Sequence, residues 1–293
     1  MKKRMNWRDV GTFFVFGGPS LFAFFAVMVV PLVFGLYLTF TNWSMQTGVH
    51  SLVWFDNYKA AFSDKAFMTQ LWFTIKYVFF TAVIANVGAF FLGLALTMGI
   101  KGQNFIRTGF FTPNLIGGLI LGYLWRFLFS YVLTYMGKTY GWALFKTSWL
   151  TDTDTAFWAL VIATSWQLMG YLMIVYIAGF SNVPADALEA AEIDGAVGWN
   201  KITKIILPLS IPGIVVCLFI SISRSFLTYD LNLGLTNGGP FASTELAAYH
   251  IVQKAFLSNE YGVGQAEAMI LFVIVATIAL TQAYLLKKVE VEA

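Results

Sequence analysis

The sequence has little charge, one cysteine and two histidines, and each shortage excludes a class of protein. Only 11% of the 293 residues are charged, against about 25% in a soluble domain. The single cysteine, Cys217, excludes an intrachain disulfide framework and a thiolate metal cluster. His50 and His250 are far apart in sequence, so no metal site is predicted. The net charge of +3 is too small for a nucleic-acid-binding surface.

Apolar residues are abundant, at 58% of the chain with a mean hydropathy of +0.72. A spanning helix needs about 20 mainly apolar residues. Six windows meet this requirement, at approximately residues 11–40, 72–98, 108–130, 156–180, 206–228 and 266–286. Glycine and proline lie inside the first window, which predicts a tilted or broken helix. The predicted fold is all-α, a polytopic membrane protein whose six transmembrane helices form one transmembrane domain over residues 1–293.

The distribution of basic residues predicts the orientation, because cytoplasmic loops are enriched in Lys and Arg. With the N-terminus inside, ten basic residues are internal: Lys2, Lys3, Arg4, Arg8, Lys101, Arg107, Lys201, Lys204, Lys287 and Lys288. Six are external: Lys59, Lys65, Lys76, Lys138, Lys146 and Lys254. Both termini are therefore predicted to be cytoplasmic, which requires an even number of spans.

The sequence contains no recognisable motif for catalysis or for an energy source. Gly137-Lys138-Thr139 resembles the end of a phosphate-binding loop, but the first glycine of that motif is replaced by Val132. No Asp or Glu lies deep within a predicted span, so a carboxylate relay for proton coupling is not expected. The sequence predicts no catalytic residue. Six membrane helices without an energy source indicate that the chain is one subunit of a larger complex.

The predicted internal loop at 181–208 has the most informative pattern. Ser181-Asn182-Val183-Pro184 predicts a helix start with a capping residue, and Gly195 predicts its end or bend. A second short helix then leads through Lys201 and Lys204. This segment is either an amphipathic helix on the inner leaflet or a protein-docking helix. Its acidic side chains argue against lipid, because surface helices favour Lys and Arg.

Within this loop a specific resemblance is found. Glu189-Ala190-Ala191, Gly195, Ile205, Leu207 and Pro208 reproduce the E-A-A-x3-G-x9-I-x-L-P signature of permease subunits of bacterial ABC importers. Leu235-Thr236-Asn237-Gly238-Gly239-Pro240 is similar to an outer-loop pattern of the carbohydrate branch. The similarity covers roughly residues 10–288 and is strongest to the maltose and glycerol-phosphate permease type.

The resemblance implies a coupling helix between the fourth and fifth spans that docks in a separate ATPase. Glu189, Ala190, Ala191 and Gly195 would form the docking element. The implied partners are a second homologous permease, an ABC ATPase dimer and an extracytoplasmic solute-binding protein. ATP and Mg would bind in the ATPase, so no cofactor is expected in this chain. The implied location is the bacterial cytoplasmic (inner) membrane, among its lipids.

Two polar stripes mark a candidate substrate path, because polar side chains within spans are costly. Ser221, Arg224, Ser225 and Thr228 recur at helical spacing in the fifth window, and Thr164, Gln167 and Tyr171 do so in the fourth. Hydroxyl, amide and aromatic groups suit a sugar. The alternative is that these side chains bond to their own helix or to a neighbouring one. Arg224 could pair with an anionic substrate, stack on a neutral sugar or bond helix carbonyls.

Three further features concern packing and the outer surface. Arg126 is expected to snorkel towards the outer interface. Gly118 and Gly122 form a small-xxx-small pair, which predicts close helix packing. Gly238-Gly239-Pro240 predicts a rigid turn that helps to receive an external binding protein.

The predicted function is a permease subunit that forms half of the translocation path for a carbohydrate, with an oligosaccharide as the lead substrate. A polyol phosphate or an acidic sugar is the alternative within the same class. From a different class, the chain could be a secondary carrier, which would transport without an ATPase, or a membrane scaffold, which would bind no solute.

Overall fold

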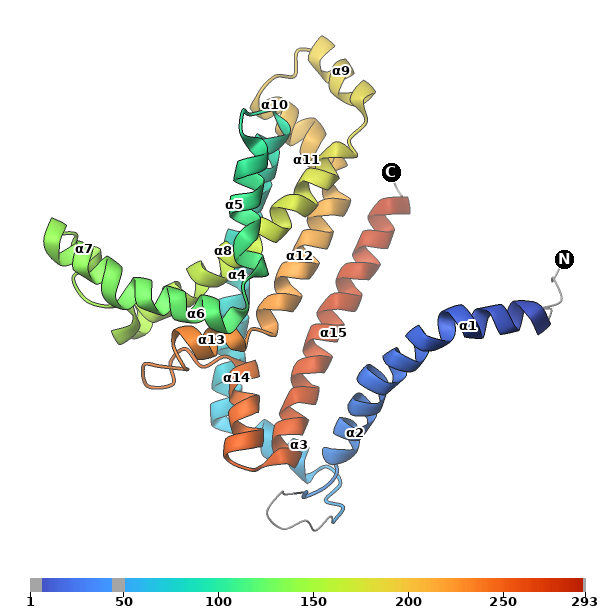
Figure 1. The fold of residues 1–293 in the computed structure, drawn as a ribbon, viewed down its shortest axis with the longest axis vertical. Helices are drawn as coiled ribbons and strands as arrows, with labels where there is room; N and C mark the ends of the chain where they lie inside the picture. Colours follow the sequence, from blue (N-terminus) through green and yellow to red (C-terminus); the bar gives the residue numbers. More distant parts are fainter. Residues whose placement is uncertain (1–6, 44–50, 292–293) are drawn as a thin grey trace. The chain divides into compact units, whose positions relative to one another are not determined.

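The computed structural model describes residues 7–43 and 51–291, which form helices joined by turns and loops (Figure 1). The all-α prediction is confirmed. Lys2, Lys3, Arg4 and His50 lie outside the described residues. The chain divides into two compact units. Unit 1 comprises residues 1–65 and 251–270, and unit 2 comprises residues 66–250 and 271–293.

Unit 1 begins with a long apolar run that stays helical despite its prolines. It consists of α1 (Trp7–Phe24), a π-helical turn η1 (Phe25–Val29) and α2 (Val30–Leu38). Pro31 lies in the first turn of α2, where its missing N–H is tolerated. The buried Asn57 of α3 (Asp56–Ser63) donates to the carbonyls of Thr39 and Thr41, each at 2.8 Å. Asn57 thereby satisfies backbone carbonyls just beyond the end of α2.

Unit 2 is built around three packed helices, α4 (Lys65–Thr97), α8 (Thr153–Ser181) and α12 (Ile211–Phe226). Its core contains Ala85 and Ala89 of α4, Leu172 and Met173 of α8 and Cys217 of α12. The small alanines let the helices approach closely. The windows 72–98 and 156–180 thus correspond to helices α4 and α8, and 266–286 lies within α15 (Tyr261–Val291).

A polar residue in the middle of α4 joins all three helices. Asn86 donates to the Ser221 hydroxyl at 2.7 Å, and its carbonyl oxygen accepts from the Tyr176 hydroxyl at 2.9 Å. Buried cross-helix hydrogen bonds of this kind are each worth about 0.6 kcal/mol in a membrane bundle. Asn86 therefore contributes to the register of α4 against α8 and α12.

The predicted window 108–130 is wrong as a single helix. The structure has α5 (Gln103–Leu115), a break at Ile116 and Gly117, and then α6 (Gly118–Phe127). Both break residues have extended ψ angles, 131° and 139°. A π turn η2 (Leu128–Val132) and α7 (Leu133–Tyr140) continue from α6. Figure 1 shows α6 and α7 running across the direction of α5 and α12.

The fifth window, 206–228, contains a bend. A segment formed by α10 (Trp199–Lys201), η5 (Ile202–Ile206) and α11 (Leu207–Leu209) meets α12 at 73°. Among the described residues, five helices are long and apolar enough to cross a membrane, or six when this bent pair counts as one span. The predicted six spans agree with the upper number, in which Gly118–Tyr140 counts as a span by length and composition alone.

Shorter elements connect these helices. They are η3 (Ala143–Phe145), η4 (Trp149–Thr151), α9 (Ala185–Ile193), α13 (Asp230–Leu235), α14 (Ala247–Val252) and η6 (Gln253–Leu257). The predicted packing role of the two glycines in α6 is supported by geometry, because a Cβ on Gly122 would lie 2.8 Å from the Leu231 carbonyl oxygen of α13.

Candidate functional site

A cavity of about 290 Å³ lies where α5, α8, α12 and α13 meet. Four of the seven predicted substrate-binding residues line it, namely Thr164, Gln167, Arg224 and Thr228. Sequence reasoning did not identify three further polar residues of the lining: Asn114, Tyr229 and Asp230. The remaining lining residues are Gly118, Leu168, Leu227 and Leu231. The wall thus combines hydroxyl, amide and charged groups with apolar surface.

Arg224 is held in the cavity wall by two neighbours. Its Nη1 donates to the side-chain oxygen of Asn114 at 2.9 Å. Its guanidinium carbon lies 4.7 Å from the centre of the Tyr171 ring, a cation–π contact. Tyr171 is not part of the cavity lining but orients Arg224. Because Arg224 remains exposed, its other N–H groups can donate to a ligand oxygen.

Gln167 contacts the same end of α5 as Arg224. Its side-chain nitrogen donates to the Ile116 carbonyl at 3.3 Å, at the break between α5 and α6. The break leaves this carbonyl without a continuing helix to donate to it. Two side chains of the cavity therefore depend on the conformation of residues 114–117.

Tyr77 of α4 joins the two hydroxyl residues of the cavity. It is fully buried, and its hydroxyl lies 2.7 Å from Thr164 Oγ1 and 3.3 Å from Thr228 Oγ1. A phenol has one proton, so at any moment it donates to one threonine and can accept from the other. The phenol fixes the spacing between α8 and the turn that follows α12 at the cavity. The sequence signal that could have identified Tyr77 is a tyrosine inside an apolar window, because its hydroxyl needs a hydrogen-bond partner when it is buried.

The other two predicted residues of the α12 stripe face the helix packing. Ser221 is buried, accepts from Asn86 and donates to the Leu218 carbonyl of its own helix at 3.0 Å. Ser225 is buried as well and is not part of the cavity lining. Their assignment to substrate stays a prediction, whereas Arg224 and Thr228 lie at the cavity.

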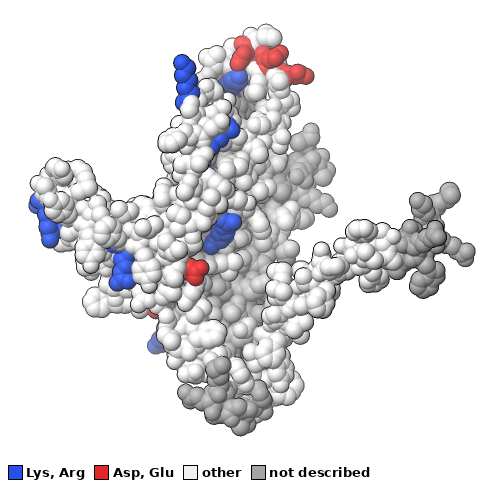
Figure 2. Space-filling model, in the orientation of Figure 1, with Lys and Arg blue, Asp and Glu red and all other residues white. Residues whose placement is uncertain are grey.

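The predicted coupling segment forms a separate helix, α9, at one end of unit 2. Its acidic residues gather there, as Figure 2 shows, and they are Asp186, Glu189, Glu192 and Asp194. Glu189 and Ala190 are exposed, while Ala191 is 5% exposed and packs inward. The helix begins directly after the predicted start segment, but the expected side-chain cap is wrong, and Pro184 occupies the N-cap position instead of the first turn. Ser181 is the last residue of α8 and donates to the Ile177 carbonyl at 2.8 Å.

Gly195 ends α9 in a Schellman motif, as its pattern predicted. Its φ is +78°, and its N–H donates to the Glu192 carbonyl at 3.1 Å. The Ala196 N–H donates to the Ala191 carbonyl at 2.8 Å. These two bonds satisfy carbonyls of the last turn, and the left-handed conformation favours glycine. The exposed acidic helix is thereby turned towards α10.

An ion pair connects α9 to the following helix. Lys201 Nζ lies 2.6 Å from Glu192 Oε1. The hydrogen bond and the charge of Lys201 hold the pKa of Glu192 below its usual range. A cavity of about 450 Å³ lies behind this segment, lined by residues that include Leu94 of α4, Phe180 of α8 and Leu188 of α9. Side chains therefore do not fill the space between α9 and the bundle.

The loop after α13 is held by a buried polar network. Asn232 donates to the Thr244 carbonyl at 2.9 Å and accepts from the Leu246 N–H at 3.1 Å. The Thr244 hydroxyl donates to the Gly239 carbonyl. Phe241, by contrast, is 96% exposed with φ of 52°. The predicted rigid turn is therefore present, and it presents an aromatic side chain.

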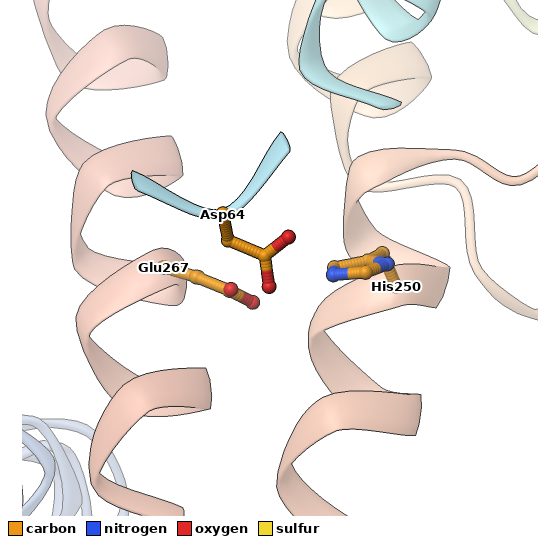
Figure 3. Close-up of side chains that lie close together, drawn as sticks. All are labelled: Asp64, His250 and Glu267. Atoms are coloured by element: carbon orange, nitrogen blue, oxygen red, sulfur yellow. The ribbon is translucent and has the colours of Figure 1, made fainter. Parts of the chain in front are cut away.

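Unit 1 contains a separate charged cluster. Lys254 Nζ lies 3.1 Å from a carboxylate oxygen of Asp64 and 3.1 Å from one of Glu260. Partial burial alone would lower the pKa of Lys254, but these hydrogen bonds and charges outweigh it and raise the pKa. Figure 3 shows Asp64 beside the buried Glu267 of α15, with carboxylate oxygens within 4.8 Å. His250, also drawn there, belongs to unit 2, where its Nδ1 lies 3.1 Å from Glu245 Oε1.

Comparisons with known proteins agree with this architecture. Residues 85–291 match the family described as "Binding-protein-dependent transport system inner membrane component". The chain is 41% identical, over 99% of both chains, to the probable starch degradation products transport system permease protein AmyD of Thermoanaerobacterium thermosulfurigenes. It is 33% identical to the multiple sugar-binding transport system permease protein MsmF of Streptococcus mutans, over 89% of this chain and 90% of that protein.

A solved structure matches nearly the whole fold. It is a bacterial ABC transporter involved in the import of the acidic polysaccharide alginate. The TM-score is 0.81 at 19% identity, and the match covers 96% of this chain and 98% of that chain. At this identity the likeness supports the fold alone.

Proposed function

Because the chain belongs to the family of inner membrane components of binding-protein-dependent transport systems, we propose that it forms half of the translocation path for an oligosaccharide. The relatives named for starch degradation products and for multiple sugars support this substrate class. The single observation that carries the proposal is the cavity of about 290 Å³, where Arg224, Gln167 and two threonines converge.

The chemistry of the cavity supports a polyhydroxylated ligand. Thr164 and Thr228 offer hydroxyls, and Gln167 and Asn114 offer amides that both donate and accept. Sugar hydroxyls likewise donate and accept. Asp230 shares the cavity with Arg224, so the two opposite charges leave the wall without a net charge. This balance favours a neutral sugar over an anionic one, although Arg224 also suits an acidic sugar or a polyol phosphate.

We assign α9 to energy coupling. Its exposed Glu189 and Ala190 would contact an ATPase, and Gly195 would set the angle at which α9 is presented. The space behind α9 leaves it room to move against the bundle. ATP and Mg belong to that ATPase subunit, and hydrolysis there would be transmitted through α9 to α8 and α12.

The proposed assembly has three kinds of partner. A second homologous permease would supply the other half of the path, and an ABC ATPase dimer would dock on the cytoplasmic side. The binding protein would approach from outside, where Phe241 is presented by its rigid loop. Both termini are cytoplasmic in this arrangement.

Uptake into reconstituted vesicles tests the proposal. The complete transporter is supplied with its binding protein, a panel of radiolabelled sugars, and ATP or no ATP. We expect ATP-dependent uptake of an oligosaccharide, and Glu189→Lys should abolish it while the chain still inserts. Uptake that needs no ATP and responds to ionophores would instead identify a secondary carrier, and no uptake of any solute would favour a scaffold.

A further inference from the structure

The segment Gly118–Tyr140, here called the α6–α7 arm, presents a row of large apolar side chains that the rest of unit 2 leaves uncovered. Tyr123, Phe127, Tyr131 and Tyr135 recur every four residues and are between 55% and 71% exposed. Tyrosine is enriched where a protein meets the membrane–water interface, because its ring is amphipathic. The proposed transport function makes no use of this row.

A second row on the arm is polar and carries its positive charges. Arg126, Ser130, Thr134 and Lys138 also recur every four residues, and both charged members are exposed. In a regular α-helix twelve residues would rotate Lys138 about 120° away from Arg126. The π turn η2 lies between them and takes up about one extra residue, or about 100°. The two charges therefore face nearly the same side.

The arm is the outgoing half of a hairpin between α5 and α8. A Cβ on Gly137 of α7 would touch the Phe145 backbone, so the returning segment lies directly against the arm. The Phe129 ring stacks on Trp149 of that segment at 5.3 Å. The hairpin therefore closes on itself through packed aromatic side chains.

The two helices that flank the hairpin run antiparallel. Phe110 of α5 lies against Gly170 of α8, and further along α5 the Ile116 carbonyl meets Gln167. Residue numbers rise in one helix as they fall in the other. The chain accordingly leaves α5 and enters α8 at the same end of the pair, so residues 116–152 complete no net crossing of the membrane.

From these observations we propose that the α6–α7 arm lies in the membrane interface at the N-terminal end of α8 and binds lipid, rather than spanning the bilayer. Its tyrosine row enters the acyl boundary, and Arg126 and Lys138 meet phosphate headgroups. Basic and aromatic side chains of this kind are typical of an interfacial helix, and here the two rows are neighbours on its surface, because Arg126 follows Tyr123 by three residues and precedes Phe127 by one. The crosswise direction of the arm in Figure 1 agrees with this placement.

Nitroxide labels measure the depth of the arm in proteoliposomes that contain the complete transporter. The native Cys217 is buried and provides an unreactive background. Single cysteines replace Tyr123 and Tyr135, twelve residues apart on the arm. As a matched control, cysteines replace Phe79 and Phe91, which are exposed and also twelve residues apart on the spanning helix α4.

Label depth is obtained from relative accessibility to oxygen and to a water-soluble nickel chelate. A crossing helix separates such a pair by up to about 18 Å in depth, and we expect the α4 pair to approach this value. The arm pair should differ by less than about 5 Å, and both labels should lie within about 10 Å of the phosphates. Labels at Arg126→Cys and Lys138→Cys should be accessible to the nickel chelate.

Two results would overturn the proposal. A depth difference on the arm equal to that on α4 would show that the arm crosses the bilayer. Labels at Tyr123 and Tyr135 that neither reagent reaches would show that a protein subunit, such as the second permease, covers this face. Sugar uptake is measured on the same vesicles, so failure of transport is distinguished from failure of the lipid contact.

Discussion

Replacing Gly195 with alanine tests whether the shape of the coupling segment matters apart from its charge. Gly195 has φ of +78°, and no atom lies within 4 Å of the position that a Cβ would occupy. An added methyl group therefore meets no neighbour, and the whole cost arises from the left-handed backbone. For residues other than glycine this conformation costs about 1–2 kcal/mol.

A cost of that size lowers the ratio of the observed α9 ending to its alternatives by about five- to thirty-fold. Because Glu189 and Ala190 are presented by this ending, we expect the apparent affinity for the ATPase to fall by up to this factor. Asparagine enters the left-handed region more readily than alanine. Gly195→Asn is therefore the matched control, and it should lose no more than about threefold.

Titration of the purified ATPase against the detergent-solubilised permease measures this affinity, and ATP-driven uptake gives the functional readout. The order wild type, Gly195→Asn, Gly195→Ala is the expected result in both assays. Equal affinity in all three proteins would refute the role of this helix ending. Equal loss in both variants would show that the site excludes any side chain, so that contact with the ATPase and not backbone conformation is decisive.

Three other predictions concern the cavity, the packing and the ion pair. Arg224→Ala removes a charged hydrogen-bond donor and should raise the KM for the transported sugar about tenfold and change which sugars compete; an unchanged profile would make it a packing residue. Gly122→Val should prevent stable folding, measured by thermal unfolding, because the Leu231 carbonyl lies 2.8 Å from the new Cβ, whereas Gly117→Ala meets no atom and should be tolerated. Lys201→Met should lower the stability of the fold at neutral pH but not in acid. Lys201 lowers the pKa of Glu192, so the ion pair stabilises the fold above the ordinary carboxyl pKa, and this stabilisation is lost as the pH falls through the lowered pKa of Glu192. A difference that persists at pH 3 would contradict the last prediction.

Local backbone signals were predictable from the sequence, and competing hydrogen bonds were not. The end of α9 followed from Gly195 because few other residues adopt a left-handed conformation. The start of α9 was predicted to within a few residues, but the start segment was expected to supply a side-chain N-cap from Ser181-Asn182, and α9 has none. The Ser181 hydroxyl bonds to the Ile177 carbonyl instead, because Ser181 is the last residue of α8, one residue beyond the predicted window 156–180.

The third span shows the limit of hydropathy. Averaging over residues 108–130 hides the two extended residues at Ile116 and Gly117, since both are compatible with an apolar window. The break exists because Gly118 and Gly122 pack against α13, a contact between distant parts of the chain. The spacing of the two glycines predicted a close contact but neither its partner nor the turn before it, so the predicted helix continued where the real chain turns.

The cavity shows why a polar stripe is an ambiguous signal. Ser221, Arg224 and Ser225 lie on α12 and Thr228 in the turn after it, yet the serines are buried and the other two line the cavity. The division depends on α4, because Asn86 reaches Ser221 while Tyr77 reaches Thr228. The stripe could therefore indicate a polar environment without distinguishing ligand contacts from helix contacts.

The hydrogen bonds of the cavity also link ligand binding to the α5–α6 break. Arg224 donates to Asn114, and Gln167 donates to the Ile116 carbonyl. A sugar that takes over Arg224 Nη1 and the side-chain nitrogen of Gln167, rather than the remaining N–H groups of Arg224, would compete with both bonds, and residues 114–117 would then lose these two contacts with α8 and α12. Each exchanged bond is worth about 1 kcal/mol, enough to shift the break between two conformations but not to unfold it. In that case, occupancy of the cavity and the position of α6 would be coupled through two side chains.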